Sequence, residues 1–220
     1  MRTTKDISYT KNRDVLSKVK SWLNENGLIK KIVHRVLIPK SQAEPRWFVQ
    51  PFINPFFHNV HKSARLKKSA RLDIFPFNYF EVGSGSTIED YTVVNNGVGE
   101  VKIGSNVRLG VGSVIMGPVE IGDDTITGQN CLITGLDHNI HEYGIPIKNQ
   151  GVTTNPTCIG KGSFLGANVS ILPGVFIGDN VVIGAGSVVT KNVPNYHMAV
   201  GNPARIVKKY CKEEREWVRL

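Results

Sequence analysis

Residues 159–194 read IGKGSFLGANVSILPGVFIGDNVVIGAGSVVTKNVP and divide into six consecutive units of six residues. Each unit opens on an aliphatic residue and holds Ser or Val in its fifth place. The opening residues are Ile159, Leu165, Ile171, Ile177, Ile183 and Val189. The fifth places hold Ser163, Val169, Val175, Val181, Ser187 and Val193. A short internal repeat of this kind indicates a solenoid, because a single unit cannot bury its apolar face alone.

The same period occurs earlier in the chain. Residues 103–138 read IGSNVR, LGVGSV, IMGPVE, IGDDTI, TGQNCL and ITGLDH, with Thr127 as the only opening residue that is not aliphatic. A rougher stretch carries the pattern back to Val82. A period of six fits neither the 3.6-residue helical period nor plain strand alternation. It fits a short strand followed by a corner, with Gly, Asn and Asp allowing the chain to turn.

Three such units close one coil of about 18 residues, and coils stack through parallel strand pairing about 4.8 Å apart. We therefore predict an all-β solenoid, a parallel β-helix of roughly five to six coils, over residues 76–207. Residues 136–158 interrupt the repeat and are expected to form a protruding loop.

The two ends of the chain do not repeat. Residues 1–75 form a basic segment in which residues 13–38 have the apolar spacing of two short amphipathic helices, separated at Asn26-Gly27. The proline-rich, aromatic residues 45–57 are expected to be extended. We expect residues 208–220 to form a C-terminal helix.

The net charge of +9 is concentrated at the start of the chain. Residues 1–76 hold 16 Lys and Arg against 5 Asp and Glu, whereas residues 77–220 hold 11 against 13. We expect the basic segment to cap the solenoid. Association with an acidic membrane surface is the less favoured alternative. No nucleic-acid motif accompanies the charge, which disfavours nucleic acid binding.

The sequence composition also indicates the cellular location of the protein. No apolar run has the length of a membrane helix, and the polar N-terminus lacks the apolar stretch of a signal peptide. A cytoplasmic protein is therefore expected. The three cysteines Cys131, Cys158 and Cys211 are odd in number and far apart, which indicates neither a disulfide framework nor a metal site.

Three features together resemble the hexapeptide-repeat acyltransferases, and in particular their sugar O-acetyltransferase branch. They are the hexads, the intruding residues 136–158 (LDHNIHEYGIPIKNQGVTTNPTC) and residues 200–209 (VGNPARIVKK). The resemblance covers about residues 82–209. It implies a left-handed β-helix, a homotrimer with active sites between subunits, and acetyl-CoA as co-substrate without a metal.

The resemblance assigns the general base to His138, where the loop leaves the repeat. An imidazole has an unperturbed pKa near 6.5, so it can remove a hydroxyl proton near working pH. His141 is a secondary candidate. Asp137, Glu142 or a backbone carbonyl is expected to fix the imidazole tautomer, and the sequence does not choose among them. The backbone N–H of Ala167 is expected to stabilise the oxyanion.

The resemblance also assigns the binding of coenzyme A. Small residues let the pantetheine approach the backbone, and cations bind its phosphates. The expected residues are Gly166, Ala167, Gly184, Ala185, Thr190, Lys191, Arg205 and Lys208.

The acceptor side departs from the family pattern. Sugar-acetylating relatives carry Asp and Asn on the coil before the histidine, but residues 109–118 here (LGVGSVIMGP) contain no carboxylate. Asn95 and Asn96 are the expected substitutes one coil earlier, with Glu89 and Asp90 nearby.

The function that follows is acetyl transfer from acetyl-CoA to a hydroxyl of a sugar or polysaccharide precursor. Alternatives are N-acetylation of an amino sugar, acetylation of a streptogramin-type xenobiotic, or a non-enzymatic trimeric scaffold. A β-helical carbonic anhydrase needs three histidines converging on zinc, whereas the repeat region offers only His138, His141 and the distant His197.

Overall fold

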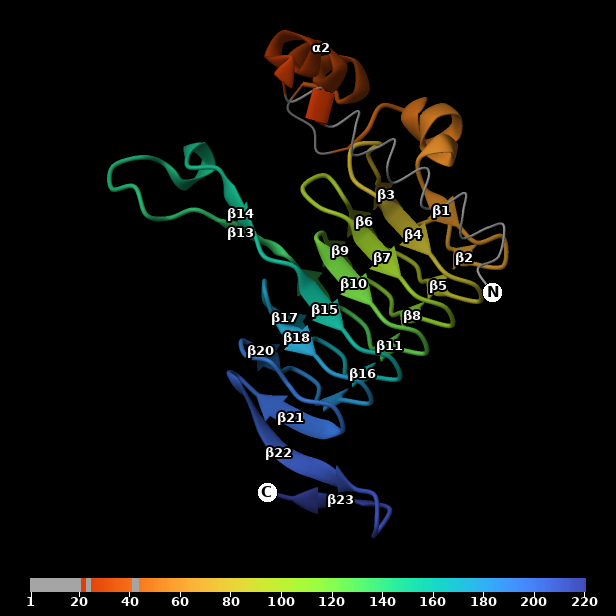
Figure 1. Cartoon of the computed structure of the whole chain (residues 1–220), viewed down its shortest axis with the longest axis vertical. Helices are drawn as coiled ribbons and strands as arrows, with labels where there is room; N and C mark the ends of the chain where they lie inside the picture. The colour runs from red at the N-terminus through yellow and green to blue at the C-terminus, as the bar shows by residue number, and fades with distance from the viewer. Residues whose placement is uncertain (1–20, 23–24, 41–43) are drawn as a thin grey trace.

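The computed structural model describes residues 21–22, 25–40 and 44–220. Three parallel sheets wrap around one apolar interior and form a three-sided β-helix, with an arm leaving its side (Figure 1). The chain visits sheets A, B and C in turn, so that each coil contributes one strand to each sheet. Among the described residues, sheets A and C each contain six strands, which gives six coils, within the predicted range of five to six.

The strands are short and stack in chain order. Sheet A contains β1 (Asn59–Val60), β4 (Phe80–Val82), β7 (Val101–Ile103), β10 (Val119–Ile121), β15 (Thr157–Ile159) and β18 (Phe176–Ile177). Sheet B contains β2 (Arg65–Leu66), β5 (Thr87–Ile88), β8 (Arg108–Leu109), β11 (Ile126–Thr127), β16 (Phe164–Leu165), β19 (Val182–Ile183), β21 (His197–Gly201), β22 (Ala204–Cys211) and β23 (Glu216–Arg219). Sheet C contains β3 (Arg71–Asp73), β6 (Val93–Asn95), β9 (Val114–Met116), β12 (Leu132–Thr134), β17 (Ser170–Ile171) and β20 (Val188–Val189).

The hexads face as predicted. Ile159 pairs with Ile177, and Leu165 pairs with Ile183. Each regular coil therefore consists of three hexads. The opening aliphatic residues of residues 159–194 are each no more than 2% exposed. The fifth-place residues are buried too. The buried Ser163 hydroxyl donates to Gly178 O at 2.9 Å, so its hydrogen-bonding capacity is satisfied inside the coil.

The fourth place of the first five hexads in residues 159–194 explains the recurrent Gly and Asn. Here the chain takes a positive φ, which Gly adopts without strain and Asn tolerates better than most residues. The residues with positive φ are Gly162, Asn168, Gly174, Asn180 and Gly186.

The solenoid begins earlier than the expected boundary at residue 76. Strand β1 pairs with β4, β2 with β5 and β3 with β6, so residues 59–73 form the first coil. Val60, Leu66 and Leu72 are six residues apart and are the sequence signal for this coil. The pattern is weak because basic residues separate them.

The N-terminal segment agrees with the sequence in part. The second expected helix is α2 (Gly27–Leu37). Most of the first expected helix lies outside the described residues. The extended conformation expected for residues 45–57 is wrong, because the chain makes a π-helical turn η1 (Val49–Ile53) and a 3₁₀ turn η2 (Asn54–Phe56). Pro55 is accommodated at the start of the second turn, where no amide hydrogen is needed.

The expected C-terminal helix is also wrong. Strand β21 continues sheet B, β22 pairs antiparallel with β21, and β23 pairs antiparallel with β22. An open sheet edge offers unpaired backbone groups to the last segment, and this tertiary pairing overrides helical propensity. Tyr210 and Trp217 face each other across the hairpin with ring centroids 5.5 Å apart.

Candidate active site

The loop expected at residues 136–158 is a defined arm. Strand β13 (Leu136–His138) pairs antiparallel with β14 (Val152–Thr154), and the short 3₁₀ turn η3 (Ile147–Asn149) lies near its tip. The Gln150 side chain donates to Glu142 O at 3.1 Å and to Ile145 O at 2.7 Å. It also accepts a hydrogen bond from the Glu142 N–H at 3.0 Å. The arm is therefore internally braced although it projects from the body (Figure 1).

The arm leaves apolar side chains uncovered in a single chain. Tyr143 is fully exposed, and four further apolar residues of the arm are at least 41% exposed. These four are Ile140, Ile145, Ile147 and Val152. A projecting hairpin with this much exposed apolar surface is typical of a segment that contacts another protein surface.

His138 lies at the base of the arm, where β13 pairs it with Val152. Its side chain is exposed. Asp137 accepts a hydrogen bond from the His138 backbone N–H at 2.8 Å, so this carboxylate contacts the backbone rather than the imidazole. Among the described residues no hydrogen-bond partner of the imidazole is found. His141 and Glu142 are exposed farther along the arm.

The expected oxyanion donor lies at a different corner of the prism. Ala167 lies between β16 and β17, at the corner between sheets B and C, whereas the arm follows β12, at the corner between sheets C and A. Strands β12 and β17 are paired in parallel, so His138 and Ala167 lie at opposite ends of sheet C. One side of the prism separates them, a distance on the order of 15–20 Å at about 3.3 Å per residue.

The corner between sheets B and C carries unpaired backbone donors. Within the described part of the chain, one N–H at this corner lacks a hydrogen-bond partner in each of four successive coils. These groups belong to Val111, Gln129, Ala167 and Ala185. Ala167 is half-buried and Ala185 is exposed, so these donors can reach a ligand lying along the corner.

The corner between sheets A and B differs, because side chains accept hydrogen bonds from the N–H groups of three of its coils. Asp123 accepts from the Ser105 N–H at 2.6 Å, and Asp179 accepts from the Lys161 N–H at 3.0 Å. Asn195 accepts from the Asp179 N–H at 2.9 Å. Asp and Asn in the hexads thus cap one corner of the solenoid and leave the other open.

The glycines at the open corner are explained by coil stacking. A Cβ on Gly128 would lie 2.5 Å from Ala167 N, and one on Gly166 would lie 2.6 Å from Ala185 N. On Gly184 it would meet the Val200 side chain at 2.6 Å. Close approach of successive coils therefore requires glycine here before any ligand is considered.

The predicted cations fall into two groups. Arg205 pairs with Val200 in the terminal hairpin, beside Gly201, whose N–H donates to the Ser187 hydroxyl at 3.0 Å. This places Arg205 at the C-terminal end of the open corner, with half-buried Lys208 on the same strand. Thr190 and Lys191 follow β20 and lie on the corner from which the arm leaves.

The two asparagines expected at the acceptor have different surroundings. Asn96 is fully buried; its Oδ1 accepts from Phe75 N at 2.7 Å and its Nδ2 donates to Phe75 O at 3.0 Å and Asn78 O at 2.6 Å. Its amide therefore holds the loop between the first two coils. Asn95 is half-buried and accepts from the Gly97 N–H at 2.7 Å. Glu89 is paired with Arg108 at 2.9 Å.

A groove of about 660 Å³ runs along sheet A and its corner with sheet B. None of the sequence-predicted site residues lines it. It carries Glu81, Glu120, Asp123 and Asp179 against Lys102 and Lys161. This excess of carboxylates makes the groove a poor site for the phosphates of a nucleotide.

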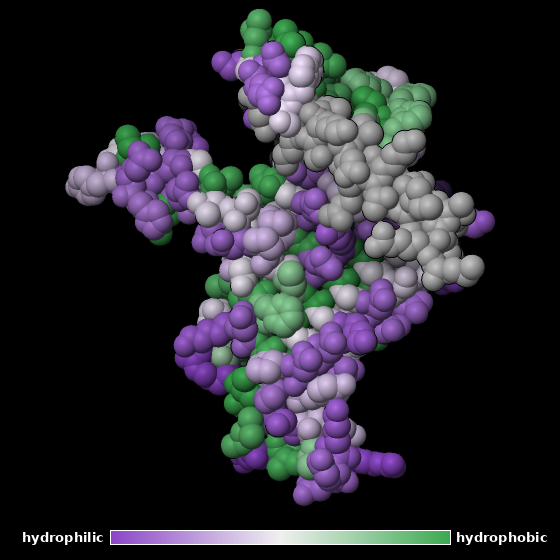
Figure 2. Space-filling view, in the orientation of Figure 1, coloured by the Kyte–Doolittle hydropathy of each residue, from purple (hydrophilic) through white to green (hydrophobic). Residues whose placement is uncertain are grey.

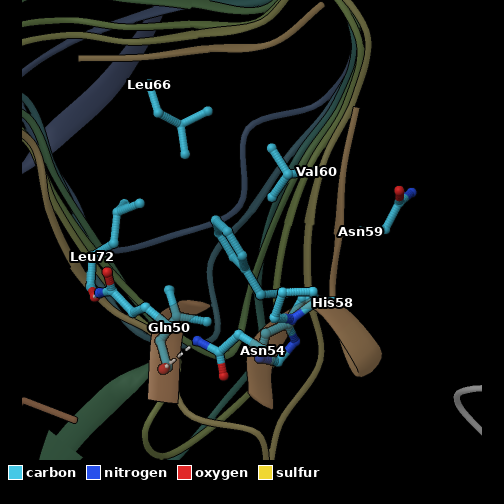
Figure 3. A pocket seen from close by; sticks show the side chains of 10 residues that line it. Gln50, Asn54, His58, Asn59, Val60, Leu66 and Leu72 are labelled. Carbon is cyan, nitrogen blue, oxygen red and sulfur yellow. Dashed lines mark hydrogen bonds between the residues drawn. The ribbon is translucent and has the colours of Figure 1, made fainter. Parts of the chain in front are cut away.

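A second cavity, of about 430 Å³, lies inside the first coil (Figure 3). Its walls are apolar, with Asn54 and His58 at one side. Asn54 Nδ2 donates to Ile74 O at 2.9 Å, but neither Asn54 Oδ1 nor a His58 ring nitrogen has a hydrogen-bond partner among the described residues. Burial lowers the pKa of His58 to about 4, although backbone groups of Phe75 and Phe57 oppose the shift. No sequence motif singles out His58, because it lies outside the hexads and the arm.

The described residues contain no cluster of three or more His, Cys, Asp or Glu that could hold a metal ion. Over the same residues, no helix is long and apolar enough to cross a membrane.

Two family models match the chain. One is described as the hexapeptide repeat of succinyl-transferase and matches residues 156–191; the other is the bacterial transferase hexapeptide and matches residues 100–135. Galactoside O-acetyltransferase from Escherichia coli is 32% identical over 163 residues, which is 73% of this chain and 77% of that protein. The chain belongs to the hexapeptide-repeat acyltransferase family.

Other similarities are partial. "Probable acetyltransferase Rv3034c" from Mycobacterium tuberculosis is 36% identical over 130 residues, 58% of this chain and 43% of that protein. The chain thus spans about half the length of several curated relatives it matches. AntD, an N-acyltransferase from Bacillus cereus solved with dTDP and 3-hydroxybutyryl-CoA, has 22% identity and a TM-score of 0.61. The match covers 71% of this chain and 85% of that one. This similarity supports the fold.

Proposed function

We propose that the protein transfers an acetyl group from acetyl-CoA to a hydroxyl of a sugar or polysaccharide precursor, with His138 as general base. The observation that carries the proposal is the ladder of unpaired N–H groups that includes Ala167 and Ala185, ending at a cationic terminus. Such a ladder offers hydrogen bonds to an extended chain rich in amides, and cations at its end suit phosphates. Acetyl-CoA combines both features.

The site we propose is shared between copies. His138 and Ala167 lie at opposite ends of sheet C, and the arm exposes apolar surface, so the arm of one copy would lie against the open corner of the next. The two contacting surfaces differ, which makes the interface heterologous, and such an interface closes into a ring when the rotation permits. A homotrimer is the ring we propose, in keeping with the three-sided shape and the family.

The chemistry needs few groups. The imidazole of His138 takes the proton of the acceptor hydroxyl as its oxygen attacks the thioester carbonyl carbon. The Ala167 N–H of the neighbouring copy donates to the oxyanion that forms. Collapse of this intermediate breaks the carbon–sulfur bond, and the imidazolium returns its proton to the departing thiolate. The products are the acetyl ester and free coenzyme A.

Replacing His138 with Ala tests the assignment. We expect turnover to fall by about 10²–10⁴, because general base catalysis contributes that much, while coenzyme A still binds in calorimetry. His141→Ala is the matched control, since it removes an equally exposed imidazole three residues away. Unchanged release of thiol by the His138→Ala variant would refute the role of His138.

The acceptor is tested separately by measuring thiol release with a panel of hydroxyl and amino sugars and a streptogramin. A preference for sugar hydroxyls supports O-acetylation; a preference for amino sugars overturns it in favour of N-acetylation. Absence of coenzyme A binding by the wild-type chain would instead favour a scaffold.

A further inference from the structure

Helix α2 exposes a continuous apolar stripe. Leu28, Ile32 and Val36 are four residues apart and therefore lie on one face of the helix. They are 75%, 55% and 53% exposed. A surface helix of a globular protein usually turns such a stripe toward the core, whereas here the described residues do not cover it.

The opposite face of α2 holds the helix on the body. Leu37 is buried, and the His34 ring stacks on Phe77 with centroids 4.7 Å apart and planes 5° apart. At the C-terminal end of the helix, Arg46 N–H donates to Leu37 O at 2.9 Å. Because these contacts fix the rotation of the helix, the apolar stripe is held facing outward.

A second group of exposed apolar residues lies beside the end of α2. Trp47 is 79% exposed and follows Arg46, whose guanidinium donates to Arg35 O at 3.4 Å. Phe52 and Phe56, on η1 and η2, are also largely exposed. Figure 2 shows apolar atoms gathered over α2 and over the neighbouring turns at this end of the molecule. We call these six residues the N-terminal apolar surface: Leu28, Ile32, Val36, Trp47, Phe52 and Phe56.

Positive charge borders this surface. Lys31 and Arg35 are exposed and four residues apart, so they form a row alongside the stripe. The first coil adds the exposed Lys62, Lys67 and Lys68. The described residues 25–40 and 44–76 hold 10 Lys and Arg against 3 Asp and Glu, whereas residues 77–220 are slightly acidic.

We propose that the N-terminal apolar surface docks on an anionic phospholipid bilayer, with α2 lying in the plane of the interface. An exposed apolar stripe flanked by Lys and Arg, with Trp beside it, is the pattern of an interfacial helix. Each basic residue near an anionic leaflet adds electrostatic attraction. A second copy of this surface is a poorer partner, because the two basic rims would repel one another. The proposal is independent of the acyl transfer reaction.

Flotation of the full chain with lipid vesicles tests the proposal. We expect binding to vesicles of phosphatidylglycerol and phosphatidylcholine, little binding to phosphatidylcholine alone, and weaker binding at high salt. Ile32→Ser with Val36→Ser should lower the partition coefficient by about tenfold or more, because two exposed apolar contacts are lost. Lys31→Glu with Arg35→Glu should have an effect of similar size.

Matched controls lie at the other end of the chain. Val218→Ser with Leu220→Ser removes exposed apolar side chains, and Arg215→Glu with Arg219→Glu reverses exposed charges. Both controls should bind within about twofold of wild type. Absence of wild-type binding to anionic vesicles, or equal losses in the controls, would overturn the proposal. So would a change in oligomeric state of the Ile32 and Val36 variant, measured by light scattering, because it would assign the surface to a second copy.

Discussion

His138 and Ala167 lie at opposite ends of two paired strands, β12 and β17, so one copy holds the proposed base and the proposed oxyanion donor on separate corners. An active site that uses both residues must therefore take them from different copies. The proposed reaction therefore requires a contact between two copies.

Two inactive variants should restore activity when they are mixed. His138→Ala removes the base, and Ala167→Trp blocks the open corner. A doubly purified trimer holds at least one copy of each variant, so about one in three of its sites combines an intact His138 with an intact corner. Co-expression with two affinity tags, followed by a thiol-release assay on the doubly purified oligomer, measures this. A mixture as inactive as both parents would show that the site is not shared.

Coil stacking predicts which glycines the fold requires. A Cβ on Gly166 would lie 2.6 Å from Ala185 N, a backbone atom that cannot rotate away. Gly166→Ala should therefore destabilise the fold by about 1–3 kcal/mol, as overpacking does. Gly27→Ala is the control, since a Cβ there meets nothing within 4 Å and helix α2 gains a better helix former. Urea unfolding measures the free energy of unfolding of both variants. Equal stability of Gly166→Ala and wild type would contradict the stacking argument.

Much of the fold could be predicted from the sequence because the hexad repeat predicts which residues of each strand are buried and which residues pair between coils. Ile159 and Ile177 recur three units apart and pair across neighbouring coils. The first coil was missed because only Val60, Leu66 and Leu72 carry the pattern and basic residues separate them. The C-terminal helix was wrongly expected because sheet pairing by β22 depends on an edge that exists only after folding.

The candidate site was predictable residue by residue but not as an arrangement. The arm and His138 could be located because the insertion breaks the repeat. The separation of the base from the N–H ladder requires knowing which corner each unit occupies. Asn96 was expected to bind the acceptor, yet its amide is buried and bonds to the backbone of Phe75 and Asn78.

Asn96 should therefore contribute to stability. Asn96→Ala leaves the Phe75 N–H and the carbonyl groups of Phe75 and Asn78 without these hydrogen-bond partners inside the protein. We expect a loss of at least about 2 kcal/mol in the free energy of unfolding. Asn95→Ala, which removes one hydrogen bond to Gly97, should cost less. Chemical denaturation measures both losses, and equal stability of the Asn96 variant and wild type would contradict the structural role.

His58 should make stability depend on pH. Its pKa in the folded protein is about 4, below the unfolded value of 6.5, so between these values the unfolded chain binds a proton that the folded chain does not. Stability is therefore complete above pH 6.5 and falls as the pH drops toward 4, by up to about 3 kcal/mol. His58→Gln should flatten this part of the profile, since it cannot titrate. Thermal unfolding between pH 4 and 7 compares the two proteins, and an identical slope in both would show that another group is responsible.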